Sequence, residues 1–193
     1  TEHVLQLGIT PVAVADAADY RTWVVNPTLP ETVPNAGTRG EPNLELLAQL
    51  RPDLILITPL LADIRDKLER IAPVAIYENF TQKHNNFALQ RANFLDLGER
   101  LGRGDIARHQ LAAMDERIAV LRDQVQAHFG GKPPAVTVLR FTSPTTVLIN
   151  GPNSMPEHAL HLLKLHPALK VPATRWGVIQ VSVTTLGRLQ DGA

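Results

Sequence analysis

The chain of 193 residues contains no cysteine. Disulfide bonds, thiolate zinc sites and cysteine nucleophiles are therefore excluded, and the absence of free thiols suits an oxidising compartment. Lysine plus arginine and aspartate plus glutamate each number 19, so the formal net charge is zero. Without a basic block, nonspecific nucleic-acid binding is not expected. No apolar run approaches the ~18 residues of a membrane-spanning helix, yet the 44% of hydrophobic residues suffices for a folded core.

Short apolar runs alternate with helical patterns in the first part of the chain. The run at 54–57 is bounded by prolines and fits a strand that is covered on both faces, as in a parallel sheet. Pro42 suits the first position of a helix that ends at Arg51, because the residue before a proline avoids the helical region. This alternation predicts an α/β fold with a parallel sheet. The predicted strands are 9–15, 33–37, 54–57 and 74–77, and the predicted helices are 41–51 and 63–71.

The middle of the chain has helical patterns, and a second set of strands and a helix follows. The patterns cover 85–101 and 105–129, and the second helix would be about 35–40 Å long. Strands are predicted at 135–141 and 146–149, and Ser154 with Glu157 forms a capping box at the start of a further helix. The sequence thus predicts two α/β lobes with mainly parallel sheets, joined by a long backbone helix. The predicted parts are an N-terminal lobe at 1–101, a connecting helix at 102–131 and an incomplete C-terminal lobe at 132–193.

Both ends of the sequence predict a fragment of a longer chain. Val4, Leu5 and Leu7 followed by Gly8 indicate the last turn of a helix with a glycine stop, so the chain opens inside a helix. A new apolar pattern begins at Leu186 and is cut off by the end of the chain. The alternative is a complete protein with frayed ends.

Two motifs have spacings that cofactors or metals use, and each has a simpler interpretation. The segment 102–107 matches a dinucleotide-binding fingerprint, but a helix rather than a strand precedes it, which favours a helix–helix turn. His158 and His161 lie three residues apart on one predicted helix face, with His166 nearby, which is a usable metal-ligand spacing. Only Glu157 adds a nearby acid, so surface or partly buried histidines are the favoured interpretation.

Arg39 and the only two tryptophans are the candidate binding residues. Arg39 follows a predicted strand and precedes a helix, where the loops of a parallel α/β sheet line the ligand crevice. Its guanidinium offers a planar fork of donors for oxygen-rich ligands; the alternative is a surface arginine that pairs with Glu41. Trp23 and Trp176 lie in predicted loops, which often marks a binding surface. Their alternative role is a lid packed over a core.

Several segments resemble the class III periplasmic substrate-binding proteins, which serve ABC importers of ferric siderophores and cobalamin. The block 37–47, with 51–55 behind it, resembles the N-lobe signature of this family. Segments 20–23 and 151–154 are similar to the branch that binds ferric-hydroxamate, ferrichrome-type siderophores for iron import. The resemblance extends over essentially the whole chain. Further similar segments, in the same order and nearly the same spacing, are 14–16, 70–73, 176–177 and 181–182.

The resemblance implies ligand-binding roles for four residues of this chain. Arg39 would hydrogen-bond the iron-chelating hydroxamate oxygens. Trp23 and Trp176 would be aromatic walls of a shallow cleft, and Leu148 would be an apolar wall in the C-terminal lobe.

The sequence also departs from the family pattern at positions that bear on specificity and docking. Leu61 stands where the family has a ligand-binding tyrosine, and Ile57 stands where it has another tryptophan. Asp66 matches the N-lobe acid that docks on the permease, whereas the matching C-lobe position is Thr184. Leu61 is therefore expected to contact the ligand, but without the hydroxyl group of the family's tyrosine.

The resemblance implies a periplasmic protein that captures a ferric-hydroxamate siderophore and delivers it to an inner-membrane ABC permease without performing a reaction. Iron would be held by the siderophore alone, with no protein metal ligand and no cofactor, which fits the lack of cysteine. The long helix predicts only a small closure on binding, and the full-length protein is expected to be a monomer.

Two other kinds of function stay open. A related protein could bind heme, cobalamin or a catecholate siderophore, but catecholate complexes are strongly anionic and only Arg39 is a convincing basic residue for such a site. From another class, a two-lobed α/β enzyme would use the segment 158–166.

Overall fold

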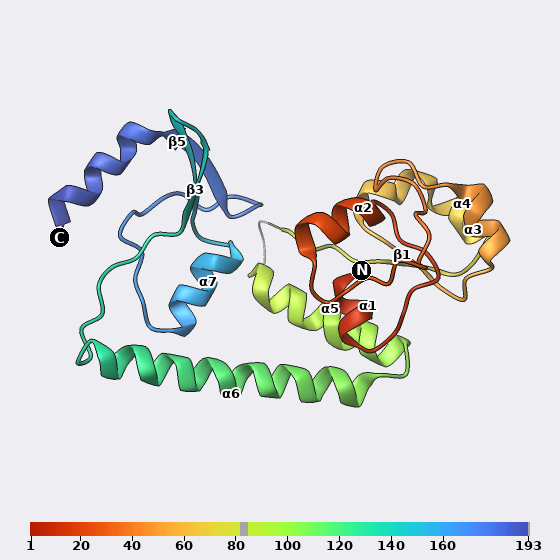
Figure 1. The fold of residues 1–193 in the computed structure, drawn as a ribbon, viewed down its shortest axis with the longest axis horizontal. Coiled ribbons are helices and arrows are strands. Elements are labelled where there is room, and N and C mark those ends of the chain that lie inside the picture. Colours follow the sequence, from red (N-terminus) through yellow and green to blue (C-terminus); the bar gives the residue numbers. More distant parts are fainter. Residues whose placement is uncertain (82–84, 193) are drawn as a thin grey trace. The chain divides into compact units, whose positions relative to one another are not determined.

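The computed structural model describes residues 1–81 and 85–192, with side chains described as far as Gly187 (Figure 1). The chain divides into two compact units. Unit 1 comprises residues 1–78 and 93–107, and unit 2 comprises residues 79–92 and 108–193. Among the described residues, no helix combines the length and the hydropathy that crossing a membrane requires.

Unit 1 is built around a short parallel sheet. Its two strands pair in register, with Ile55 opposite Val74 and Ile57 opposite Ile76, as the proline-bounded apolar runs predicted. Ile55, Ile57 and Leu68 are among the buried residues of the core that forms on this sheet. The elements are α1 (Glu2–Gln6), α2 (Ala17–Asp19), a π-helical turn (Tyr20–Val24), α3 (Leu44–Leu50), β1 (Ile55–Ile57), a 3-10 helix (Pro59–Ile64), α4 (Arg65–Glu69) and β2 (Val74–Ile76).

Local signals in unit 1 explain where its elements stop. Helix α1 ends at Gln6, and Gly8 follows in a left-handed conformation with φ of 75°. The N–H groups of Gly8 and Ile9 donate to the carbonyls of Leu5 and Val4, as the glycine stop predicted. Helix α3 begins later than predicted, because Asn43 rather than the loop before Pro42 caps it: the Asn43 side chain accepts a hydrogen bond from the Leu46 N–H at 2.9 Å.

The predicted strands 9–15 and 33–37 are reduced to isolated bridges. Val14 pairs with Asn35 in parallel, and Gly37 pairs with Pro42 in antiparallel orientation. Pro11 and Pro34 flank the parallel bridge and have no N–H to donate, so the ladder cannot extend through them. The bridge still fixes the positions of the residues that follow Val14 and Asn35.

Two helices occupy the middle of the chain, close to the predicted positions. Helix α5 runs over Asn86–Arg100 and α6 over Gly104–His128, and the 25 residues of α6 give a length of about 37 Å. They are joined by a tight turn in which the Arg103 N–H donates to the Gly98 carbonyl at 2.7 Å. Helix α5 precedes the segment 102–107, and a dinucleotide-binding fingerprint would need a strand in that place. The interpretation of this segment as a helix–helix turn is therefore confirmed.

Unit 2 contains a three-stranded sheet in the order β3–β4–β5, and all of its pairings are antiparallel. The expectation of mainly parallel sheets holds for β1 and β2 but is wrong here. Only two residues, Pro144 and Thr145, join β3 to β4, and a connection this short permits only a hairpin. Buried Val147 and Ile149 anchor the sheet in its core. The elements are β3 (Leu139–Ser143), β4 (Thr146–Asn150), α7 (Met155–Leu162), β5 (Val178–Ser182) and a 3-10 helix (Val183–Gly192).

Candidate functional site

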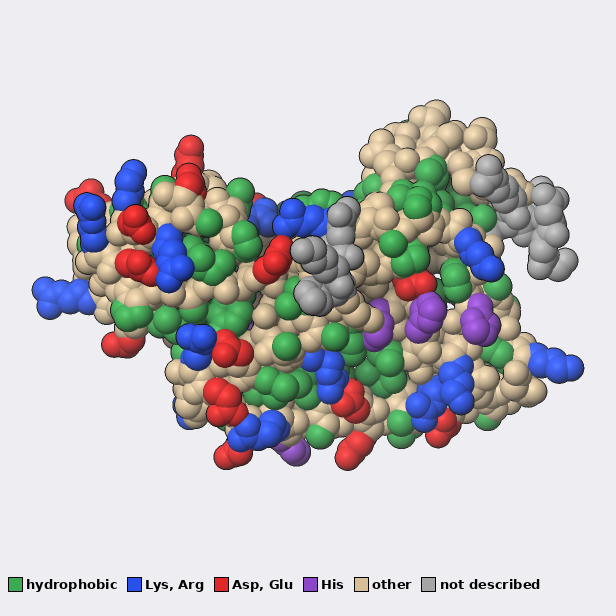
Figure 2. Space-filling model, turned by 180° about the vertical axis from the view of Figure 1, so that it is seen from behind, with side chains coloured by type: hydrophobic (Ala, Val, Ile, Leu, Met, Phe, Trp, Pro, Cys, Tyr) green, Lys and Arg blue, Asp and Glu red, His purple; other side chains and the backbone are tan. Residues whose placement is uncertain are grey.

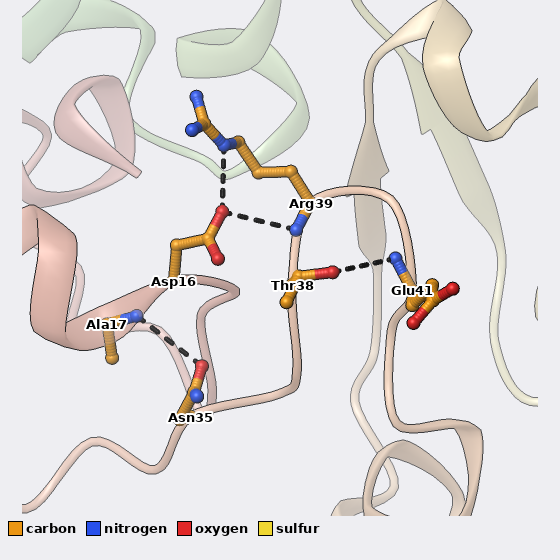
Figure 3. A network of polar contacts seen from close by, with 6 residues as sticks. All are labelled: Asp16, Ala17, Asn35, Thr38, Arg39 and Glu41. Atoms are coloured by element: carbon orange, nitrogen blue, oxygen red, sulfur yellow. Dashed lines mark hydrogen bonds and ion pairs between the residues drawn. The ribbon is translucent and has the colours of Figure 1, made fainter.

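Arg39 is held by an acidic residue that the sequence analysis did not pair with it. One carboxylate oxygen of Asp16, Oδ2, accepts hydrogen bonds from Arg39 Nε at 2.7 Å and from the Arg39 backbone N–H at 3.2 Å (Figure 3). The alternative partner, Glu41, instead uses its backbone N–H to donate to Thr38 Oγ1 at 3.0 Å. Because Nε is engaged with Asp16, the two terminal nitrogens of Arg39 point away from the carboxylate (Figure 3).

The backbone around Arg39 is fixed by a tight turn. Thr38 and Glu41 exchange backbone hydrogen bonds at 3.1 and 3.2 Å. Gly37 has a positive φ of 95°, and a Cβ at this position would lie 2.5 Å from the Glu41 carbonyl oxygen, so the turn requires glycine. The Gly37 carbonyl in turn accepts the Asp16 N–H at 2.9 Å. Both members of the Asp16–Arg39 pair therefore have anchored backbones, although the Arg39 side chain is 80% exposed.

Trp23 is presented to solvent by the π-helical turn. The Tyr20 side chain on this turn is buried, and its hydroxyl donates to the Pro27 carbonyl at 2.8 Å. Arg21 donates to the Pro30 carbonyl at 2.7 Å, which ties the following loop to the same turn. Trp23 itself is 81% exposed. Its interpretation as a lid over the core is therefore wrong, and a surface-binding role stays a prediction.

The remaining predicted residues of unit 1 differ in exposure. Leu61 lies in the 3-10 helix after β1 and packs, half-buried, against the core cluster. Ile57 is buried in β1. Asp66 is exposed in the first turn of α4, where a negative charge is favourable near the positive end of the helix dipole.

Unit 1 also contains a polar network around Tyr77 that sequence reasoning missed. The Tyr77 hydroxyl donates to Asp96 Oδ2 at 2.6 Å, and Arg100 Nε donates to the same oxygen at 2.7 Å. Burial and, after it, the hydrogen bond to Asp96 raise the pKa of Tyr77 to about 12. The hydrogen bonds from Tyr77 and Arg100 lower the pKa of Asp96. The network joins the end of β2 to α5.

In unit 2, Trp176 forms part of an exposed cluster with an aromatic and a basic neighbour. Its ring lies 5.0 Å from the Phe80 ring, and the Arg175 guanidinium carbon lies 5.3 Å from the centre of the indole. Arg175 Nε donates to the Phe80 carbonyl at 3.2 Å. Trp176 is 57% exposed, so a large part of the indole can contact a ligand.

Two asparagines hold the turn that carries Trp176. Asn86 is only 1% exposed, and its Nδ2 donates to the carbonyls of Asn153 at 2.8 Å and Arg175 at 3.2 Å. Its Oδ1 accepts the Thr81 N–H at 3.0 Å. Asn153 Nδ2 donates to the carbonyls of Thr81 and Arg175 at 2.7 and 3.1 Å. The two amides thus tie together the segments around Thr81, Asn153 and Arg175. The sequence motif 151–154 includes Asn153, but no signal in the sequence pairs it with Asn86.

The predicted histidine cluster does not converge on one point. The His158 ring stacks on Phe87 with centroids 4.1 Å apart, whereas His161 Nε2 lies 2.7 Å from Glu157 Oε1. Burial, and to a smaller extent His161, lowers the pKa of His158. Ser154 caps α7 as predicted by accepting the Glu157 N–H at 3.1 Å, but the Glu157 carboxylate serves His161 instead of completing the box. Among the described residues, no group of three or more histidines and acids could hold a metal ion.

Leu148 and Thr184 have surroundings that fit only limited roles. Leu148 lies on β4 between Arg140 of β3 and Gln180 of β5 and is half-buried. Its neighbours Val147 and Ile149 face the core, so Leu148 lies on the opposite face of the sheet. Thr184 is exposed, and its hydroxyl donates a hydrogen bond to Ser182 Oγ at 2.9 Å. Threonine carries no charge, so this position lacks the acid that the family uses for docking.

Basic and acidic side chains are interspersed on the face drawn in Figure 2, and neither sign dominates it.

Two compact α/β units and a 25-residue helix are the features that the sequence predicted for a two-lobed substrate-binding protein. The chain belongs to the periplasmic binding protein family, whose pattern matches residues 1–188. This result confirms the family and the α/β two-lobed class that the sequence motifs predicted.

Three similar proteins show how much of this chain, and how much of their own length, the similarity covers. The iron(3+)-hydroxamate-binding protein FhuD of Escherichia coli is 31% identical over 190 residues, which cover 98% of this chain and 63% of that protein. The structure of FhuD from Vibrio cholerae with bound Fe3+-Desferal has a TM-score of 0.92 and 39% identity, covering 99% of this chain and 72% of that one. A putative ABC transporter substrate-binding lipoprotein of Bacillus subtilis, YhfQ, is 27% identical over 65% of this chain and 39% of its own length. The chain thus spans less than two thirds of the curated relatives named here.

Proposed function

We propose that this chain binds a ferric-hydroxamate siderophore and belongs to a protein that delivers it to an ABC permease in the inner membrane. The observation that carries the proposal is Arg39, whose Nε is fixed on Asp16 while its terminal nitrogens face away from that carboxylate. Charged donors held in this way suit the negatively polarised oxygens of a hydroxamate–iron complex. The relatives named for hydroxamate binding or for bound Fe3+-Desferal support the same ligand class.

The other predicted contacts complement this donor by their chemistry. Trp23 and Trp176 offer exposed aromatic surface to the apolar arms of a chelate, and Leu148 and Leu61 are the proposed aliphatic contacts. Leu61 has less free surface than the tryptophans, because it packs against the core of unit 1. The family has a tyrosine at this position. The leucine of this chain has no hydroxyl group, so position 61 favours a ligand that needs no hydrogen bond there.

The proposal includes the cargo, the partner and the location of the protein. The siderophore supplies all ligands of the ferric ion, so the protein needs neither a metal site of its own nor a cofactor and performs no reaction. Asp66 is the proposed contact with the permease, the protein acts as a monomer, and the family supports a periplasmic location.

The test is the binding of ferrichrome, followed by the quenching of tryptophan emission, in the wild type and in Arg39→Ala. Loss of charge-assisted hydrogen bonds costs about 1.5–3 kcal/mol, so Arg39→Ala should weaken binding by roughly 10- to 100-fold. Arg103→Ala is the matched control, since Arg103 is an exposed arginine in the helix–helix turn of unit 1. An unchanged dissociation constant in Arg39→Ala would remove Arg39 from the site, and no binding by the wild type would overturn the function.

A further inference from the structure

The turn at 151–154 joins β4 to α7 and holds the loop that carries Trp176. The Gly151 N–H donates to the carbonyl of Gly177, directly after Trp176, at 2.8 Å. The carbonyl of the residue directly before Trp176 accepts a hydrogen bond from Asn153 Nδ2 at 3.1 Å. The turn therefore fixes the backbone on both sides of the indole, although none of its own side chains is a proposed ligand contact.

Gly177 lets the loop approach the turn closely. This residue is buried and has a positive φ of 70°, and a Cβ here would lie 2.5 Å from Ser154 Cα and 2.6 Å from the carbonyl carbon of Asn153. No side chain fits into this space, so the contact requires glycine. Asn153 also has a positive φ, of 77°, which asparagine adopts more readily than most residues. Both residues therefore suit a close approach of two backbones, and this approach sets the position of Trp176.

Trp176 depends on this backbone for its direction, because a residue that is 57% exposed receives little support from core packing. Its ring neighbour is Phe80, with the ring centroids 5.0 Å apart. A binding residue has to be held within about 0.5 Å of its productive position. We propose that Asn153 and Gly177 are positioning residues, which place the indole of Trp176 against the ligand. The inference rests on the proposed function and gives the turn at 151–154 a part in it.

Gly177→Ala tests the close approach, with the dissociation constant of ferrichrome measured by isothermal titration calorimetry. The added Cβ has no space against the turn, so the loop with Trp176 has to move. We expect the dissociation constant to rise about 3- to 5-fold, since the loss is limited to the contact of one indole. Gly131→Ala is the matched control: Gly131 also has a positive φ, of 77°, but a Cβ there meets no atom within 4 Å. This control introduces the same kind of backbone strain and should leave the dissociation constant unchanged.

Asn153→Gly tests the amide, because glycine keeps the positive φ but removes the hydrogen bonds. The dissociation constant of ferrichrome should again rise about 3- to 5-fold. In a Trp176→Ala background the same substitution should change it by less than about 2-fold, because two residues that act through one contact are not additive. A merely structural role would weaken binding equally in both backgrounds. Gln126→Ala is the control for stability: it removes a half-buried amide of unit 2 that donates to the Leu163 carbonyl at 3.1 Å, and it should leave the dissociation constant unchanged.

Three results would overturn the positioning role. They are an unchanged dissociation constant in Gly177→Ala, an equal rise for Asn153→Gly with and without Trp176→Ala, and a rise of the same size in Gly131→Ala or Gln126→Ala. Should one of the two test variants fail to fold, the other decides by the same comparison in the Trp176→Ala background. Unchanged affinity in Trp176→Ala would also overturn this inference while leaving the proposed function in place. A wild type that binds no ferrichrome would instead overturn the proposed function, so the two failures are distinguishable.

Discussion

Replacing Asn86 by alanine tests whether the buried amide network holds unit 2 together. The Asn86 side chain is 1% exposed, and its removal leaves the Thr81 N–H and the Asn153 carbonyl without the bonds that they make to it. The Arg175 carbonyl keeps its bond from Asn153 Nδ2. Each of these two partly buried groups loses one hydrogen bond, at about 1–3 kcal/mol apiece, and the better helix propensity of alanine returns about 0.5 kcal/mol. The expected net loss in the free energy of unfolding is about 2–5 kcal/mol.

The assay is urea unfolding followed by the emission of Trp176, in a Trp23→Phe background so that only unit 2 is reported. With a denaturant dependence of about 1.5–2 kcal/mol per molar urea, the midpoint should fall by roughly 1–3 M. Gln124→Ala is the control, since it truncates an exposed amide on α6 and should change stability by less than about 0.5 kcal/mol. A loss below about 1 kcal/mol in Asn86→Ala would refute the reasoning, because the network would then contribute no more than a surface contact.

Three further predictions concern separate parts of the molecule. Asp66→Ala should leave ferrichrome binding intact but slow uptake in cells, since exposed docking charges mainly affect the encounter with a partner; normal uptake would remove Asp66 from docking. Trp176→Ala should weaken ferrichrome binding several-fold through lost aromatic contact, and equal affinity would exclude the exposed indole from the site. The raised pKa of Tyr77, about 12, means that its contribution to stability is full below about pH 10 and is lost as the pH rises through 12. Tyr77→Phe should remove this part of the alkaline loss, and a phenol absorbance change near pH 10 from Tyr77 itself would contradict the hydrogen-bonded, buried hydroxyl.

Features that depend on neighbours in sequence were predictable. Proline-bounded apolar runs identified β1 and β2, and the glycine after α1 identified its end, because these signals act within a few residues. Arg39 could be singled out because it lies in a loop between a strand signal and a helix signal. For the same reason Ser154 was recognised as the cap of α7.

Features that depend on contacts between distant segments were not predictable from one sequence. Asp16 and Arg39 are 23 residues apart, and Asn86 and Asn153 are 67 apart, so only the folded chain brings them together. The predicted strand 9–15 failed because periodicity does not reveal whether a proline-flanked run finds a long partner strand. Strand β5 was missed although Ile179 and Val181 alternate with polar residues, which is a usable period-two signal.

The central claim is the proposed binding of a ferric hydroxamate, in preference to the catecholate, heme and corrin ligands that the sequence left open. Isothermal titration calorimetry with ferrichrome, a ferric tris-catecholate, heme and cobalamin tests it most directly, because all four are compared on one preparation. The account predicts saturable one-to-one binding of ferrichrome, at least tenfold tighter than any of the others. Tighter binding of heme, cobalamin or the catecholate complex, or no heat of binding with ferrichrome, would contradict it.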